Sequence, residues 1–153
     1  MQTQLKIAIG CDLAGYDLKV QIVERLRKGG YQVFDMGCES SQSGDYPEAA
    51  KAVATQIKSG TADRGIVICG TGNGIAMASN KIKGIRCALC SDVFPTLLAR
   101  EHNNANVLAM GAWLVDLEKA MQIIEVFMFG RYYGAAAHQK RIDTMHSFEQ
   151  EAE

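Results

Sequence analysis

The amino-acid sequence predicts a doubly wound α/β fold, in which helices cover both faces of one parallel sheet. Five short apolar segments alternate with segments whose apolar residues recur at helical spacing. The apolar segments are followed by polar or glycine-containing stretches that are typical of loops. No internal repeat, low-complexity tract or linker divides the 153 residues, so we expect a single domain over residues 1–153.

The expected strands are continuous apolar runs, which is typical of strands that are buried on both faces. They cover residues 5–10, 31–36, 65–69, 85–90 and 106–110. Because parallel strands need long crossover connections, we expect the helices between them to pack on the sheet.

The expected helices each carry an apolar stripe, and several of their ends are marked by glycine, proline or a capping residue. These markers are Gly29–Gly30, Pro47, Ser91 or Asp92, and Gly130. The predicted buried side chains are Leu18, Ile22, Val23 and Leu26; Ala50, Val53, Ala54 and Ile57; Phe94, Leu97 and Leu98; Leu117, Met121, Ile124 and Met128; and Ile142, Met145 and Phe148. The last helix is extra to the doubly wound unit, so it packs either on the domain or on a second copy of the chain.

The composition argues against several classes of protein. A net charge of −1 and a pI near 6.3 give no electrostatic reason to expect nucleic acid or membrane partners. The first residues lack the pattern of a signal peptide, and no apolar run approaches the roughly 18 residues of a membrane span. The five cysteines are odd in number, and Cys87 and Cys90 form one CxxC without the second pair of a zinc site. We therefore expect a reduced, cytoplasmic protein.

The stretch with the most chemical content covers residues 65–81, and its pattern predicts a buried strand, a tight glycine loop and a helix start. The loop at 70–74 leaves backbone N–H groups at a helix N-terminus, where the helix dipole favours negative charge. Cys69 ends the strand, and open α/β sheets bind ligands at that edge. A thiol beside such a loop suits acid–base chemistry. The alternative is a structural turn with a buried core cysteine.

Other polar residues are expected at the same edge, because every loop from a strand to a helix opens there in this fold. They are Asp12, Asp45–Tyr46, Ser91–Asp92 and Gly111–Ala112. His102 and Asn103 follow a helix and belong to the opposite edge, so only a neighbouring subunit or an unusual turn would bring them to the cluster. Taken singly, an aspartate in a loop more often forms a turn or caps a helix than takes part in catalysis. A histidine at the end of a helix usually interacts with the helix dipole.

Six separated motifs occur in one order along the chain. They are IAIGCD at 7–12, DYP at 45–47, ICGTGNG at 68–74, NKIKGIR at 80–86, HNNANV at 102–107 and HQKRID at 138–143. With these motifs the chain resembles the ribose-5-phosphate isomerase B family, which includes the galactose-6-phosphate isomerase subunits, over residues 5–145. The resemblance implies a Rossmann-like αβα sandwich with an extra C-terminal helix. It also implies a homodimer whose active sites draw on both chains, and it leaves open whether dimers pair into tetramers.

The chemistry implied by this resemblance is aldose–ketose isomerisation of a sugar or sugar phosphate through a cis-enediolate, without a metal or other cofactor. Cys69 is then the base; some members use a Glu after the glycine loop, but this chain has Ile75 there. By the same resemblance, Thr71 orients the thiol, the loop N–H groups hold the oxyanion, and His102 opens the sugar ring. The implied ligands of the substrate are Asp12, Tyr46 and Asn103 for its hydroxyl groups, and Gly70, Gly72, Asn73 and Gly74 in the loop.

The chain departs from the family pattern where the substrate's phosphate is bound. Leu13, Trp113 and Ala137 stand where the family commonly has basic residues that help to bind the phosphate. Of the basic residues expected at this site, only Arg141 is present. Because a leucine, a tryptophan and an alanine make an apolar wall, we expect an isomerase of a free or deoxy sugar. The alternative is a ribose-5-phosphate or other sugar-phosphate isomerase with a rearranged anion site. In that case Lys140 and Arg131, which are near Arg141 in the sequence, would help to bind the phosphate.

Two further functions fit parts of the pattern. A non-catalytic sugar-binding subunit would need no base, but this chain keeps all three of the implied catalytic residues. A dinucleotide-binding protein would carry GxGxxG after its first strand, where this chain has CDLAG at 11–15. Isomerisation is therefore the preferred interpretation.

Overall fold

The computed structural model describes residues 4–151 and contains a five-stranded parallel sheet with the order β2-β1-β3-β5-β4. The strands are β1 Lys6–Cys11, β2 Gln32–Asp35, β3 Arg64–Cys69, β4 Cys87–Leu89 and β5 Val107–Gly111. The helices are the 3₁₀ turn η1 Leu13–Gly15, α1 Tyr16–Lys28, α2 Tyr46–Lys58, α3 Asn73–Asn80, α4 Val93–Glu101, α5 Leu117–Phe129 and α6 Ala136–Glu151. The doubly wound α/β prediction is confirmed, with each strand within two residues of its predicted bounds.

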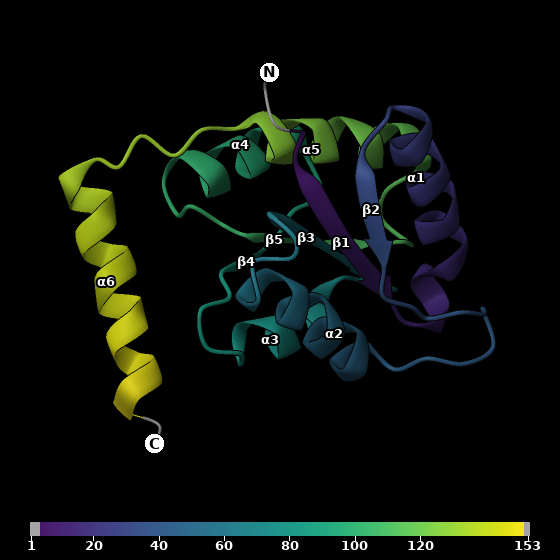
Figure 1. Ribbon diagram of the computed structural model, residues 1–153, viewed down its shortest axis with the longest axis horizontal. Helices are drawn as coiled ribbons and strands as arrows, with labels where there is room; N and C mark the ends of the chain where they lie inside the picture. Colours follow the sequence, from purple (N-terminus) through teal and green to yellow (C-terminus); the bar gives the residue numbers. More distant parts are fainter. Residues whose placement is uncertain (1–3, 152–153) are drawn as a thin grey trace.

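Two hydrophobic cores fill the space between the sheet and its helices (Figure 1). The helices α1 and α5 cover one face, with α4 against α5, and α2 and α3 cover the other. Successive side chains of β3 alternate between the cores, so Ile66 and Ile68 belong to the first, and Val67 and Cys69 to the second. The thiol of Cys69 therefore faces the layer in which α2 and α3 begin.

The loops after β1 and β3 lie where the order of the strands reverses. β1 pairs with β2 on one side and with β3 on the other, and β3 pairs in turn with β5. The chain leaves these two strands in opposite directions, which opens a crevice at their carboxyl ends. Asp12 borders this crevice, and its N–H donates to the carbonyl of Ile68 at 3.1 Å.

Helix boundaries follow the predicted markers. Asp92 caps α4 by accepting the N–H of Val93 at 2.8 Å, and Pro47 lies in the first turn of α2. Gly29 follows the last residue of α1, and Gly130 follows that of α5. The four side chains predicted for the core face of α1 are all buried. These local patterns predict the helix ends correctly because capping residues and glycines satisfy backbone groups that lack a partner within the helix.

The predicted core face of α4 is wrong. Phe94 is 67% exposed, and Leu97 and Leu98 are only half-buried. The buried residues of α4 are Thr96, Ala99 and Arg100. The helix packs against α5, and the guanidinium of Arg100 is tolerated in the interior because it donates to the carbonyl groups of Ala105 and Gly130.

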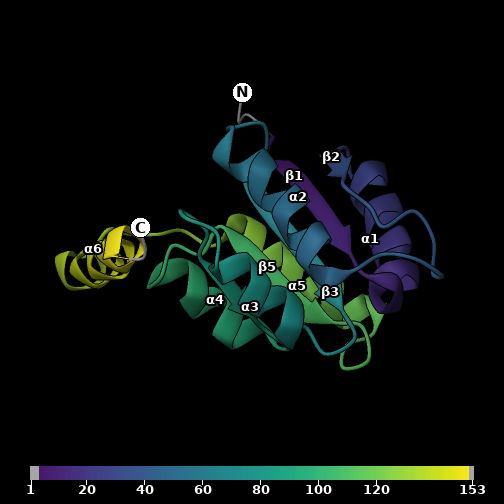
Figure 2. The same cartoon turned by 90° about the horizontal axis from the view of Figure 1, so that it is seen from below.

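The last helix, α6, stands apart from the layered body in both views (Figures 1 and 2). Ile142 is its buried residue, whereas Met145 and Phe148 are exposed, so the predicted three-residue core face does not form within one chain. Two of its contacts to the body are hydrogen bonds: His146 hydrogen-bonds Arg86, and Glu149 accepts the N–H of Gly84 at 2.9 Å. No helix within residues 4–151 is long and apolar enough to cross a membrane.

Candidate active site

The thiol of Cys69 is held at the end of β3 by the loop that follows it. Its side chain is 5% exposed, and Sγ accepts a hydrogen bond from the backbone N–H of Gly72 at 3.1 Å. Gly72 has φ +83°, which glycine adopts without strain, and it directly precedes α3. A Cβ there would lie 2.5 Å from Leu89 and 2.9 Å from the carbonyl carbon of Met110. The turn therefore requires glycine, and it directs an N–H at the sulfur beside a helix N-terminus.

The hydroxyl of Thr71 has a different partner from the one that the resemblance implied. Its Oγ1 accepts a hydrogen bond from the N–H of Asn73 at 3.2 Å, a local turn that leads into α3. Within the described part of the chain, the thiol is held by the N–H of Gly72 instead. Both Thr71 and Asn73 are exposed at the mouth of the crevice, where a ligand can reach them.

Two aromatic rings lie against the glycine loop. The ring of Tyr46, at the start of α2, would be 3.1 Å from a Cβ on Gly74. The indole of Trp113 would be 2.7 Å from a Cβ on Gly70, and this side chain is 72% exposed. The glycines thus allow both rings to approach the backbone of the loop. The structure brings Tyr46 and Trp113 to the thiol's edge of the sheet, as the sequence predicts.

Asp12 and Leu13 complete this edge. The carboxylate of Asp12 accepts the N–H of Gly15 at 3.1 Å and so caps η1, the structural role that a loop aspartate most often has. Leu13 is exposed, so it adds an apolar side chain to this edge. The carboxyl edge therefore gathers a thiol, a carboxylate, hydroxyl groups and apolar surface.

The other cysteines differ in their surroundings. Burial raises the pKa of Cys11 to about 12, and its sulfur lies 3.4 Å from that of Cys38. Burial also raises the pKa of Cys87 to about 12, and that of Cys90 in the same direction. These three groups are held as neutral thiols at pH 7. Cys69 is distinguished by its place at the switch point and beside the N-terminus of α3.

His102 and Asn103 lie at the opposite edge, as the topology predicts. His102 ends α4, and its ring stacks on that of His138 in α6 with centroids 4.3 Å apart. Arg86, just before β4, donates to the carbonyl of Asn103 at 3.1 Å. Because the six residues of β3 span about 16 Å between the two edges, one chain does not bring His102 to its own Cys69.

The remaining candidates lie on α6, beside His102 rather than beside the thiol. Ala137 and Arg141 are both exposed there and flank His138. His138 is a site candidate that the sequence pattern does not single out, although the HQKRID motif contains it. Its position against His102 depends on how α6 meets the end of α4, and no local signal encodes that contact.

The fold and the site define a class of protein. A thiol lies at the switch point of a doubly wound sheet, beside a glycine loop and near groups that can bind hydroxyls. This arrangement suits proton transfer at a carbon next to a carbonyl group. Residues 7–145 match the family model described as Ribose/Galactose Isomerase. The chain belongs to this family, as its motifs predict, and is an aldose–ketose isomerase.

Individual relatives agree with this assignment. The chain is 44% identical over 145 residues to ribose-5-phosphate isomerase B of Escherichia coli K12, which covers 95% of this chain and 97% of that one. Its structure resembles ribose-5-phosphate isomerase B of Clostridium thermocellum with a TM-score of 0.94 and 42% identity, covering 97% and 100% of the two chains. The Mycoplasma genitalium enzyme with bound ribulose-5-phosphate has a TM-score of 0.88 and 38% identity, covering 95% and 97%.

We predict that Gly111→Ala lowers kcat by about 10²-fold while the protein stays folded. A Cβ on Gly111 would lie 2.6 Å from the carbonyl oxygen of Thr71, so the loop that donates to the thiol must shift. A displacement of about 1 Å in a site costs on the order of 10²-fold in rate. The matched control is Gly29→Ala, whose Cβ meets its nearest neighbour at 3.3 Å at the end of α1. Steady-state kinetics that show an unchanged kcat in Gly111→Ala would contradict the prediction.

Proposed function

We propose that the protein interconverts ribose 5-phosphate and ribulose 5-phosphate. The observation that carries the proposal is the hydrogen bond from the Gly72 N–H to the Cys69 thiol, at the edge where this fold binds its ligands. Relatives named ribose-5-phosphate isomerase B, one of them with ribulose-5-phosphate bound, support the substrate. They favour the sugar-phosphate alternative over the free or deoxy sugar that the three lost basic residues predicted.

Cys69 is the base in this proposal. As a thiolate it removes the proton from the carbon next to the carbonyl, and the thiol then protonates the neighbouring carbon. The hydroxyl proton passes from one enediolate oxygen to the other, so the thiolate is regenerated and no net proton is consumed. The N–H of Gly72 donates to the sulfur, so it stabilises the negative charge of the thiolate. The cis-enediolate oxygen is held by N–H groups of the loop at 70–74, at the start of α3. Asp12 and Tyr46 bind hydroxyl groups of the sugar from the same edge.

A second copy of the chain supplies the rest of the proposed site. His102, Asn103 and Arg141 lie at the amino edge or on α6, away from the thiol of their own chain. In a homodimer, His102 of the second copy opens the sugar ring and Asn103 binds a hydroxyl. Apolar side chains left uncovered around the edge strand β4 support such an interface. They are Met77, Leu89, Phe94, Met145 and Phe148.

The phosphate end of the proposed site is the part in which this chain differs from its family pattern. Arg141 and Lys140 are exposed on α6 and form the cationic pair that a second copy would bring to the crevice. The crevice itself offers Leu13 and the exposed indole of Trp113. This apolar surface favours a free or deoxy sugar as the second candidate substrate, with its carbon face against the indole.

The proposed location is the cytoplasm. All five cysteines are free, and the sulfurs of Cys11 and Cys38 lie 3.4 Å apart without a bond between them. Closely spaced thiols stay unbonded in a reducing compartment such as the cytoplasm. We therefore place the isomerase among cytoplasmic enzymes of carbohydrate metabolism.

The choice of substrate is tested by kcat/KM for ribose 5-phosphate and free ribose. We expect a preference of about 10²-fold or more for the phosphate. Arg141→Ala should remove about 10-fold or more of that preference, because hydrogen bonds between charged groups contribute about 1.5–3 kcal/mol. Arg25→Ala, which removes an exposed arginine from α1, is the matched control and should leave the preference intact. A kcat/KM for free ribose equal to or above that for the phosphate would favour the apolar-pocket alternative.

The shared site is tested by mixing two inactive variants, Cys69→Ala and His102→Ala. Random exchange makes half of the dimers mixed, and each mixed dimer has one intact site, so we expect about a quarter of the wild-type activity. A mixture of Cys69→Ala with Cys69→Ser is the control and should stay inactive. No recovery, with subunit exchange demonstrated by native mass spectrometry, would rule out a site built from both chains.

A further inference from the structure

A second cavity lies at the amino edge of the sheet, away from the thiol. It has a volume of about 960 Å³ and opens between the start of β3, the end of α4 and the end of α5. Arg64 begins β3 and Cys69 ends it, so the cavity and the thiol are about 16 Å apart along the strand. A volume of this order is at the upper end of small-molecule sites.

One end of the cavity is cationic. Arg100 is 3% exposed, and its guanidinium donates to the Gly130 carbonyl at 3.3 Å, the Asn104 side-chain oxygen at 3.0 Å and the Ala105 carbonyl. All three acceptors are neutral, so the positive charge is buried without a carboxylate partner. Burial, together with the nearby charges of Arg64 and Arg86, lowers the pKa of Arg100 to about 10.

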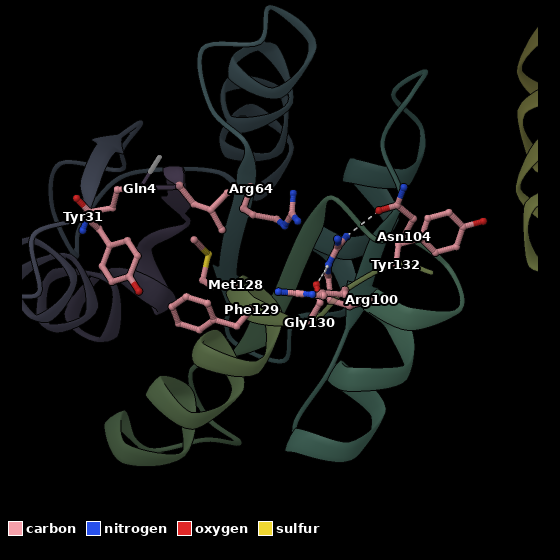
Figure 3. Close-up of a pocket in the computed structure, with 11 residues that line it drawn as sticks. Gln4, Tyr31, Arg64, Arg100, Asn104, Met128, Phe129, Gly130 and Tyr132 are labelled. Atoms are coloured by element: carbon pink, nitrogen blue, oxygen red, sulfur yellow. Dashed lines mark hydrogen bonds between the residues drawn. The ribbon is translucent and has the colours of Figure 1, made fainter. Parts of the chain in front are cut away.

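Arg64 faces the same space from β3 (Figure 3). Its Nε is buried without a hydrogen-bond partner, while Nη1 donates to the carbonyl of Asp63 at 2.9 Å. The carboxylate of Asp63 lies outside the lining and accepts the backbone N–H of Lys6 at 2.8 Å. Among the described residues that line the cavity there is no Asp or Glu, whereas Arg131 adds a third cation. A half-buried guanidinium whose buried Nε makes no hydrogen bond is costly unless an acceptor binds it.

The other end of the cavity is apolar and aromatic. Figure 3 shows Tyr31, Met128 and Phe129 on one side and Arg64 and Arg100 on the other. Phe129 is exposed, so its ring is accessible to a ligand in the cavity. The separation of charge from apolar surface suits a ligand with a phosphate at one end and a flat ring at the other.

We propose that this cavity binds a phosphorylated compound of the size of a nucleoside monophosphate, with its phosphate between Arg64 and Arg100 and its ring against Tyr31 and Phe129. The site is separate from the proposed catalytic centre and takes a different ligand. No residue of the proposed proton-transfer machinery lines it.

The test is isothermal titration calorimetry of the whole chain with AMP, and with inorganic phosphate and adenosine as its two halves. We expect AMP to bind about 10-fold or more tightly than either half. Arg64→Gln should weaken AMP binding by about 10-fold or more, because a charge-assisted hydrogen bond is lost. Lys51→Gln, which removes one positive charge from an exposed position on α2 outside the lining, should bind AMP as the wild type does.

Two further readouts separate a ligand site from a structural role for Arg64. The kcat/KM of Arg64→Gln for isomerisation should stay within about 2-fold of wild type, since neither the thiol of Cys69 nor the ring of His102 lines this cavity. Its Tm should be equal to or above that of wild type, because a half-buried charge with an unsatisfied Nε is removed. The proposal is overturned if AMP gives no heat of binding up to about 1 mM. It is equally overturned if Arg64→Gln binds AMP with unchanged affinity, or loses binding together with a lowered Tm.

Discussion

The hydrogen bond from the Gly72 N–H to the Cys69 thiol is the interaction on which the proposed chemistry depends. It exists because the loop after β3 is confined on several sides: Leu89 and the backbone of Met110 leave no room for a Cβ on Gly72. The ends of β1 and β5 fix the loop further, since the N–H of Asp12 donates to Ile68 and that of Ala112 donates to Cys69. Position, rather than any unusual residue type, distinguishes this thiol from the four others.

The parallel sheet divides the candidate residues into two groups. The thiol and its neighbours occupy the carboxyl edge, while His102, Asn103 and α6 occupy the amino edge about 16 Å away. A single chain therefore presents two halves of a site that do not meet. In the proposed homodimer, a second copy would cover the exposed apolar residues around β4 and bring its α6 to the thiol.

Local sequence signals predicted the fold well, because caps, glycine stops and apolar strands each satisfy a local need. They failed where a helix faces something other than the sheet. In α4 the apolar residues Phe94 and Leu97 lie outside the core while Arg100 is buried. In α6 Ile142 is buried, but Met145 and Phe148 are left exposed. Within the site, the motifs identified candidate residues but not the groups that they contact. The hydrogen bond of Thr71 and the stacking of His138 on His102 depend on how the folded chain places them.

The central claim is that Cys69 is the base, and the kcat of Cys69→Ala and Cys69→Ser tests it most directly. Both variants should keep the circular dichroism spectrum and Tm of the wild type, because the side chain is small and lies at the end of its strand. We expect kcat to fall by about 10²-fold or more in both, since neither methyl nor hydroxyl replaces a thiolate in proton transfer. A folded Cys69→Ala variant with near-normal turnover would contradict the account.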